Sequence, residues 1–226
     1  MKSTKFAQVA GIMLALTFAF SCSGGDDKDG GNDPNNGGTS SPSGCRGGTS
    51  GTFKDTRDGT TTTYKTTKIC TQTWMAENLN YAVAGSKCGT DDFGLSDANT
   101  TFCDKYGRLY DWETAMTACP NGWHLPSLEE WEVLFTAVGG KETAGKYLKA
   151  KSGWEGDGNG EDTFGFSALP GGYSSGRSFG EFGDYGVWWS SSAESSRSLG
   201  MSRNYEYIHY GGSIDRGGLF SVRCVQ

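Results

Sequence analysis

The stretch YGRLYDWETAMTACPNGWHLPSLEEWEVL, residues 106–134, decides the fold of this chain. Asp111 is a favourable N-cap residue, and it predicts a helix over residues 112–119. The Pro-Asn-Gly sequence at residues 120–122 ends that helix. Helical spacing places four of its residues on one face: Trp112, Ala115, Met116 and Cys119.

A second helix is predicted to begin at Ser127, which forms the S-x-x-E capping pattern with Glu130. The two glycines at residues 139–140 stop it, and a third helix is expected over residues 142–150. The second helix carries one apolar stripe, formed by Leu128, Trp131, Leu134, Phe135 and Val138.

Strands are predicted before these helices. The Asp58-Gly59 dipeptide is a strong turn signal, and β-branched and aromatic residues lie on both sides of it. We therefore expect a hairpin of residues 53–56 and 62–69, followed by a short strand at residues 72–75.

From Gly153 onward the sequence is rich in glycine and irregular, which indicates long loops between short strands. In the last strand, alternation puts Phe220, Val222 and Cys224 on one face and Ser221 and Arg223 on the other. Strands, then two or three helices, then loops and further strands make an α+β fold with small antiparallel sheets. The expected late strands are residues 187–190, 198–203, 205–210 and 219–225.

The first 21 residues are interpreted as an export signal. Lys2 and Lys5 precede an apolar run, residues 6–20, that is too short for a membrane span. Ala19-Phe20-Ser21 before Cys22 resembles a bacterial lipobox, which predicts that Cys22 becomes the lipidated first residue. Acyl chains on Cys22 would anchor the protein to a membrane without spanning it. Ordinary cleavage near Ser21, leaving a free cysteine, is the alternative.

Residues 22–44 are predicted to be a flexible tether, because residues 23–44 contain no aromatic or aliphatic side chain. The acidic start of the tether resembles signals that send lipoproteins to the cell surface in some Gram-negative bacteria, and a plain solubilising linker is the alternative. We expect an exported protein, lipid-anchored in the outer membrane and exposed at the surface, whose single domain spans residues 45–226. The acidic residues at the start of the tether are Asp26, Asp27 and Asp29.

The charge balance excludes nucleic acid as a partner. The formal net charge is −6 over 226 residues. Cleavage before Cys22 removes Lys2 and Lys5 and makes the charge more negative. An acidic chain of this kind is repelled by phosphate backbones and by anionic lipid surfaces.

Several segments resemble the Fibrobacter succinogenes major paralogous domain family, a group of secreted or lipid-anchored bacterial domains. That family is similar to the C-type lectin-like fold, including its formylglycine-generating-enzyme relatives. The resemblance implies a compact, disulfide-stapled domain with two helices, a small antiparallel sheet and a long loop region, and it implies no particular activity. The segments are TFKDTRDGTTTTYKTTKI, QTWMAENLNY, residues 106–134, EDTFGFSALPGGY, VWWSSS and FSVRCV, and they cover most of residues 52–226.

The cysteine count fits an exported domain. The chain has seven cysteines, and setting Cys22 aside leaves six, an even number that predicts three disulfides. In C-type lectin-like domains a cysteine at a helix end bridges to one in the last strand. The resemblance therefore implies a bond between Cys119 and Cys224.

The other two disulfides follow once that pair is assigned. Cys88 and Cys103 flank the polar insertion at residues 89–102 and would staple it locally. Cys45 and Cys70 then remain for each other. The family pattern commonly has glycine at position 70, so this third bond is expected to be a local addition.

One loop is a candidate calcium site, and calcium is the only cofactor the sequence indicates. Its oxygen-bearing side chains alternate with glycine, as in loops that wrap Ca²⁺. The interpretation that the sequence favours is instead a solvated turn without a cofactor, in which Asp162 accepts backbone N–H bonds and holds the following FGFSALPGG segment. The candidate ligands are Asp157, Asn159, Glu161 and Asp162.

A ligand-binding surface is predicted around Trp188 and Trp189, because flat aromatic faces stack on sugar rings. Alternation along a strand puts the two rings on opposite faces, so one is expected in the core and the other exposed. Core packing of both is the interpretation that the sequence favours overall. Aromatic neighbours are Tyr173, Tyr185 and Phe182, and side chains expected to bond sugar hydroxyls are Asp184, Glu181 and Arg177.

These features predict a non-catalytic, surface-anchored binding module whose ligand is a polysaccharide or another surface protein. A structural or assembly role in the cell envelope, acting through protein–protein contacts, is the second hypothesis. The third is an enzyme distantly similar to the formylglycine-generating group, which uses reduced cysteines. We assign no catalytic residue: His124 lies just before a helix cap, where a structural hydrogen bond is the usual role.

Overall fold

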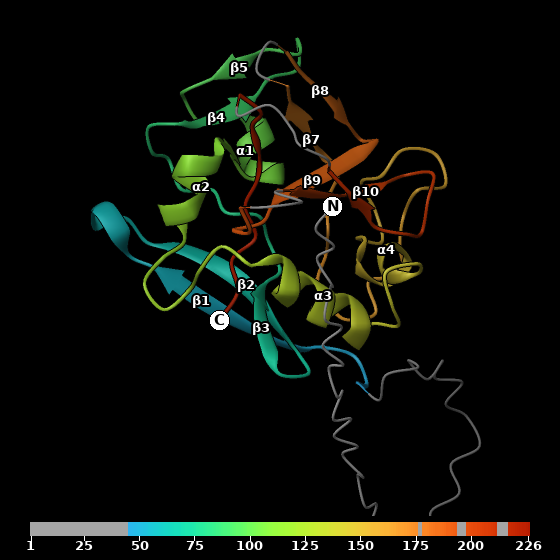
Figure 1. The fold of residues 1–226 in the computed structure, drawn as a ribbon. Coiled ribbons are helices and arrows are strands. Elements are labelled where there is room, and N and C mark those ends of the chain that lie inside the picture. Colours follow the sequence, from blue (N-terminus) through green and yellow to red (C-terminus); the bar gives the residue numbers. More distant parts are fainter. Residues whose placement is uncertain (1–44, 176–177, 194–197, 212–216) are drawn as a thin grey trace, which may run out of the picture. The chain divides into compact units, whose positions relative to one another are not determined.

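The computed structural model describes residues 45–175, 178–193, 198–211 and 217–226 (Figure 1). The predicted export signal, Cys22, the tether and Arg177 lie outside the described residues. Within the described ranges, no helix has the length and apolar character needed to cross a membrane.

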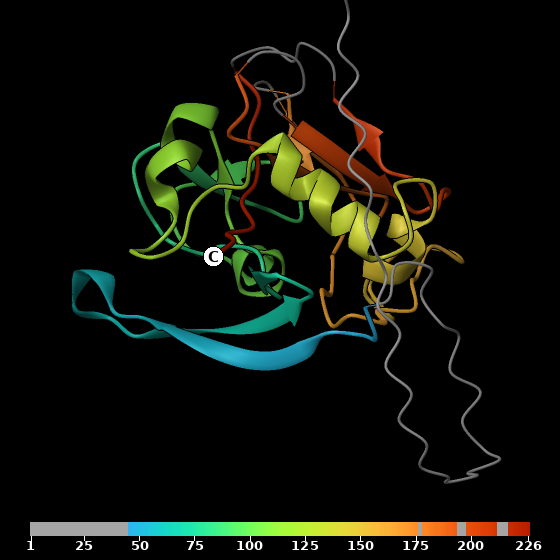
Figure 2. The same cartoon turned by 60° about the horizontal axis from the view of Figure 1, so that its bottom comes forward.

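A three-stranded antiparallel sheet opens the domain. It consists of β1 (Thr49–Asp55), β2 (Thr62–Ile69) and β3 (Gln72–Met75), in that order. The expected hairpin and the strand at residues 72–75 are confirmed, and β1 begins earlier than residue 53. Figure 2 shows the hairpin extending beneath α3 (Leu128–Ala137) and the rest of the domain.

The two helices predicted from residues 106–134 are confirmed. In α2 (Trp112–Ala118) the carboxylate of Asp111 accepts a hydrogen bond from the backbone N–H of Thr114 at 2.7 Å. In α3, Ser127 and Glu130 form both halves of the capping box. One residue was predicted on the wrong face: Met116 is 42% exposed, because Ala115 and Ala118 make the core contacts of α2.

The described residues contain four α-helices rather than two or three. The third predicted helix is the short α4 (Ala144–Leu148), and α1 (Thr101–Tyr106) was not predicted. The helix α1 is a single six-residue segment that contains Cys103, and it is too short to show an apolar periodicity in the sequence.

The larger sheet is mixed, so the expectation of purely antiparallel sheets is wrong. Strand β9 (Tyr185–Trp189) pairs in parallel with both β7 (Gly171–Ser174) and β12 (Phe220–Ser221). The reason is local: β8 reverses the chain after β7, and β9 reverses it again, so β7 and β9 run in the same direction. The strand order of the larger sheet is β11-β10-β9-β12-β6-β4-β5, and β7 pairs with β8 and β9.

Most strands of this sheet are short. The late strands begin or end within a few residues of the expected positions, but two of them shrink to two residues. The strands are β4 (Ser86–Gly89), β5 (Leu95–Ser96), β6 (Leu109–Tyr110), β7 (Gly171–Ser174), β8 (Phe179–Phe182), β9 (Tyr185–Trp189), β10 (Ser198–Ser202), β11 (His209–Tyr210) and β12 (Phe220–Ser221).

Two apolar clusters form most of the core, one on each side of β9. The first joins the three-stranded sheet to α3 and β10, and it contains Trp74, Trp131 and Trp188. The second contains Trp189 and Phe220 and packs against α2. In Figures 1 and 2, α3 lies between the small sheet and the β9–β10 part of the larger sheet.

The alternation predicted for the last strand is confirmed, but it leaves Arg223 fully buried. Its Nε and Nη2 donate to Asn78 Oδ1 at 3.0 and 2.8 Å, and its Nη1 donates to the carbonyls of Phe166 and Met75. Burial lowers the pKa of Arg223 to about 9, although the charges of Asp162 and Glu77 act to raise it. The guanidinium therefore remains protonated at neutral pH.

The three disulfides pair as the resemblance implied. They join Cys119 to Cys224, Cys88 to Cys103, and Cys45 to Cys70. The backbone of Cys70 has φ +53°, in the left-handed region that favours glycine. A cysteine at this position therefore combines a cross-link with an unfavourable backbone conformation.

Replacing Arg223 by methionine is expected to lower the free energy of unfolding by about 2–4 kcal/mol, because two buried carbonyls lose their donor. Urea unfolding of the full chain, followed by tryptophan fluorescence under oxidising conditions, measures this. The control is Arg203→Met, at an arginine that is 37% exposed and ion-paired, where the loss is within about 1 kcal/mol. Equal losses in the two variants would contradict the role assigned to Arg223.

Removing the Cys45–Cys70 bond is expected to destabilise the domain by roughly 3–4 kcal/mol, because it closes a loop with a sequence separation of 25. The double variant Cys45→Ala/Cys70→Gly should be more stable than Cys45→Ala/Cys70→Ala by about 0.5–1 kcal/mol, since glycine tolerates φ +53°. Thermal unfolding of both variants measures this difference in stability. An alanine variant as stable as the glycine variant would refute the backbone argument.

Candidate functional site

Neither Trp188 nor Trp189 presents a ring face to solvent, so core packing of both is confirmed and the expectation that one of them is exposed is wrong. Their exposed fractions are 0% and 1%. Trp188 Nε1 donates to Asn78 Oδ1 at 2.8 Å, and Trp189 Nε1 donates to the carbonyl of Tyr110 at 2.6 Å. The reason is that β9 lies inside the sheet, between β10 and β12, with an apolar cluster on each face.

Two of the predicted aromatic residues do line a cavity. Tyr173 from β7 and Tyr185 from β9 are half-buried, and their side chains border a hollow of about 350 Å³. The other walls come mainly from β9, β10, β11 and β12 and are mostly apolar, including Val187, Leu199 and Phe220. The candidate functional site is this hollow, which we call the tyrosine cavity.

Strand register explains why a cavity forms here. In the antiparallel pairs, Gly200 of β10 lies opposite Val187 of β9 and opposite His209 of β11. Opposite residues of an antiparallel pair point to the same face of the sheet. Gly200 contributes no side chain to this row, so the space between Val187 and His209 stays empty.

Two polar atoms in the wall of the tyrosine cavity have no hydrogen-bond partner among the described residues. They are Ser198 Oγ and His209 Nε2, and both atoms are buried. Burial lowers the pKa of His209, so the imidazole is neutral at pH 7. Each unpaired polar atom costs roughly 1–3 kcal/mol, which a ligand with matching groups would recover.

An exposed aromatic surface adjoins the cavity. Tyr205 and Tyr207 are 46% and 38% exposed, and their ring centroids lie 4.9 Å apart. The ring of Tyr207 lies 4.5 Å from that of His209, which also lines the cavity. We call these three residues the aromatic ridge. Sequence reasoning placed them in a strand and did not identify them as a binding surface.

The backbone that carries the aromatic ridge is held in place. The buried Lys149 Nζ donates to the carbonyl of Tyr205 at 3.2 Å, and Gly145 N–H donates to that of Glu206 at 2.7 Å. The side chain of Ile208 is 4% exposed and packs in the core. The tyrosine rings are therefore presented to solvent from an anchored segment.

Other predicted ligand residues lie elsewhere. Asp184 is not part of the cavity wall, and it forms an ion pair with Arg203 at 3.0 Å. Phe182 packs against Phe102, and Glu181 is an exposed residue of β8 with φ +62°. Among the described residues of the predicted set, the structure therefore brings only the two tyrosines together.

The loop predicted as a calcium site forms a hydrogen-bonded turn. Asp162 accepts from the backbone N–H and hydroxyl of Ser167 at 2.7 and 2.6 Å, and so holds the FGFSALPGG segment. Asn159 accepts from the backbone of Trp154, and Glu161 pairs with Lys146. In the part of the chain that the structure describes, which includes Asp157, no three His, Cys, Asp or Glu residues are grouped to hold a metal.

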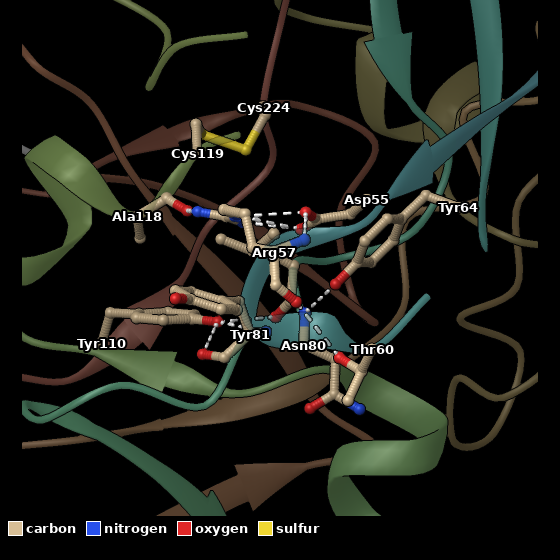
Figure 3. A network of polar contacts seen from close by, with 11 residues as sticks. Asp55, Arg57, Thr60, Tyr64, Asn80, Tyr81, Tyr110, Ala118, Cys119 and Cys224 are labelled. Carbon is tan, nitrogen blue, oxygen red and sulfur yellow. Dashed lines mark hydrogen bonds and ion pairs between the residues drawn. A yellow bond between two sulfur atoms is a disulfide. The ribbon is translucent and has the colours of Figure 1, made fainter. Parts of the chain in front are cut away.

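A second, polar hollow of about 290 Å³ lies beside the tip of the β1–β2 hairpin, and Figure 3 shows the polar contacts of residues that line it, Asp55 and Arg57 among them. Arg57 pairs with both carboxylate oxygens of Asp55, donates to the carbonyl of Ala118 at 2.7 Å, and lies 3.8 Å from the ring centroid of Tyr81. These contacts hold the hairpin tip to the end of α2. The guanidinium of Arg57 thus already binds partners within the domain, and we assign this hollow a structural role.

A family model describing the Fibrobacter succinogenes major domain matches residues 67–226, and the chain belongs to this family. The match begins inside β2, so it includes the tyrosine cavity and the aromatic ridge but not β1, Asp55 or Arg57. No curated protein and no solved structure matches the chain.

The Asp55–Arg57 pair is expected to stabilise the domain in a pH-dependent way. Burial acts to raise the pKa of Asp55, but the hydrogen bonds and charge of Arg57 outweigh it and lower the pKa below its ordinary value. The stabilisation is therefore present at neutral pH and lost as pH falls below about 4.

Urea midpoints of the wild type and Asp55→Asn, measured from pH 7 to pH 2, check this expectation. The gap between the two proteins should be largest at pH 7 and should close in acid. Asp91→Asn, at an exposed position, is the control and should shift the midpoint little at any pH. A gap for Asp55→Asn that does not change with pH would contradict the argument.

Proposed function

We propose that the protein is a non-catalytic, surface-anchored binding module with a C-type lectin-like fold, and that its ligand is a polysaccharide. The observation that carries the proposal is the aromatic ridge, Tyr205, Tyr207 and His209, continuous with the tyrosine cavity. Exposed tyrosine rings offer flat apolar faces with a polar end, a combination suited to ligands that have both apolar surface and hydrated polar groups. A concave site with few polar groups beside them fits a bound sugar unit.

The setting of the domain supports a role at the cell surface. Three disulfides indicate an oxidising environment outside the cytoplasm. In our proposal Cys22 carries the lipid anchor and residues 22–44 form the tether. A flexible tether of this length has an end-to-end distance of roughly 25 Å, enough to hold the domain clear of lipid headgroups.

The cysteines and His124 support a non-catalytic role. All six cysteines of the domain are in disulfides, whereas the chemistry of formylglycine-generating relatives uses reduced cysteines. His124 Nε2 lies 2.6 Å from the carboxylate of Glu130, which is itself part of the α3 capping box. An assembly role through protein contacts is the second candidate, and the exposed ring of Phe93, 58% accessible, favours it.

Alanine at Tyr205 or Tyr207 is expected to weaken polysaccharide binding about tenfold without changing the melting temperature, because both rings are largely exposed. Binding of the full-length protein, purified with detergent, to a panel of plant and bacterial polysaccharides measures this. The control is Phe93→Ala, which removes an exposed aromatic ring outside the aromatic ridge.

The same panel, run with calcium and with chelator, tests the loop that contains Asp162. We expect equal binding in both conditions, because the Asp162 carboxylate is already occupied by Ser167. Binding that disappears on chelation would restore calcium as a cofactor. If no polysaccharide binds and a stoichiometric protein co-purifies from envelope extracts, the assembly role replaces the proposed function.

A further inference from the structure

We infer that the tyrosine cavity holds the acetamido group of an N-acetylated sugar, so that the module selects glycans containing N-acetylhexosamine. The inference rests on the proposed glycan-binding function and adds the chemical class of the ligand. Three properties of the cavity carry it: described wall residues without charge, two unpartnered polar atoms, and the space above Gly200.

The walls require an uncharged ligand group with an apolar part. None of the described residues that line the cavity is Asp, Glu, Lys or Arg. A charged ligand group would lose its hydration there without gaining an opposite charge. Val187, Leu199 and Phe220 instead offer surface on which a methyl group is buried favourably. A sugar hydroxyl in the same place would face apolar side chains.

The two polar atoms match the rest of an acetamido group. The hydroxyl of Ser198, whose residue is 1% exposed, can donate or accept, and a neutral imidazole donates from one nitrogen and accepts at the other. An acetamido group carries one carbonyl acceptor and one N–H donor next to its methyl group. It can therefore satisfy both Ser198 and His209 while burying an apolar end, which a hydroxyl group cannot do.

Strand register places these groups around one space. Ser198 and Gly200 are two residues apart on β10 and so point to the same face, and His209 lies opposite Gly200 on β11. Both polar atoms therefore flank the gap left by Gly200. The volume of about 350 Å³ accommodates a sugar ring as well as its acetamido group, with Tyr173 and Tyr185 as the wall beside the ring.

Chitotetraose and cellotetraose are the decisive ligand pair, because they share one linkage and differ only in an acetamido group against a hydroxyl on each sugar. Isothermal titration of the full-length protein in detergent should show chitotetraose binding at least about tenfold tighter. The reason is that cellotetraose leaves buried polar atoms of the cavity unpaired.

Two variants locate the preference in the cavity. Ser198→Ala should reduce it to within roughly threefold, because one of the two polar matches is gone. Gly200→Val should abolish chitotetraose binding by filling the cavity. Its Cβ would lie 3.5 Å from the carbonyl oxygen of Gly186 and 3.7 Å from Val187 Cγ2, which are ordinary contacts.

The matched control is Gly180→Val, because a Cβ at Gly180 meets nothing within 4 Å and this strand residue is not in the cavity wall. This variant should bind chitotetraose like the wild type. Melting temperatures of all variants confirm that they fold, and if Gly200→Val unfolds, Ser198→Ala carries the test.

The outcomes separate this inference from the proposed function. Equal affinity for the two tetrasaccharides overturns the acetamido assignment and leaves glycan binding in place. Chitotetraose binding that survives Gly200→Val in folded protein puts the ligand outside the cavity and also overturns the assignment. If neither tetrasaccharide nor any polysaccharide of the panel binds, the proposed function fails and the inference fails with it.

Discussion

The side-chain amide of Asn78 is the contact on which the rest of the domain depends. Its oxygen accepts from two nitrogens of the buried Arg223 and from the indole of Trp188, and its nitrogen donates to the carbonyl of Tyr106 and to Ser221 Oγ. One amide thus joins the chain after β3 to the end of α1, to β9 and to β12. The buried guanidinium is satisfied by neutral oxygens that converge only in the folded state, so the network favours a single arrangement of these elements.

The rigidity of β9 follows from this network and determines the character of the candidate site. Trp188 is fixed on one face of the strand and Trp189 on the other, where its indole is bonded to the backbone of β6. Tyr185 and Val187, on the same strand, therefore form an immobile wall of the tyrosine cavity. A wall that is already ordered loses little conformational entropy when a ligand binds. Stability and recognition thus share one strand.

Sequence patterns predicted the elements that carry local signals: the hairpin around Asp58-Gly59 and the capped helices after Asp111 and Ser127. They missed β5 and β6, because two residues hold no periodicity. Alternation along β9 could not show that both faces of the strand are covered, so the expectation that one tryptophan is exposed was wrong. The cavity was missed because it arises from pairing between strands. The available signal was Gly200, a glycine inside a strand pattern, which marks close approach of a ligand or another backbone.

Residues 220–225 supply β12, Arg223, the partner of Cys119, and the bridges from Val225 to Trp74 and His124. A ribosome makes these six residues after nearly all the others of the domain. Until then, β9 and β6 lack β12, the strand that lies between them, so the nascent polypeptide cannot close into its final form. This order of events suits a chain that passes through a narrow translocation channel, because the chain stays unfolded until passage is almost complete. Once the domain is outside the cytoplasm, oxidation of Cys119 and Cys224 forms the disulfide that links residues at a sequence separation of 105.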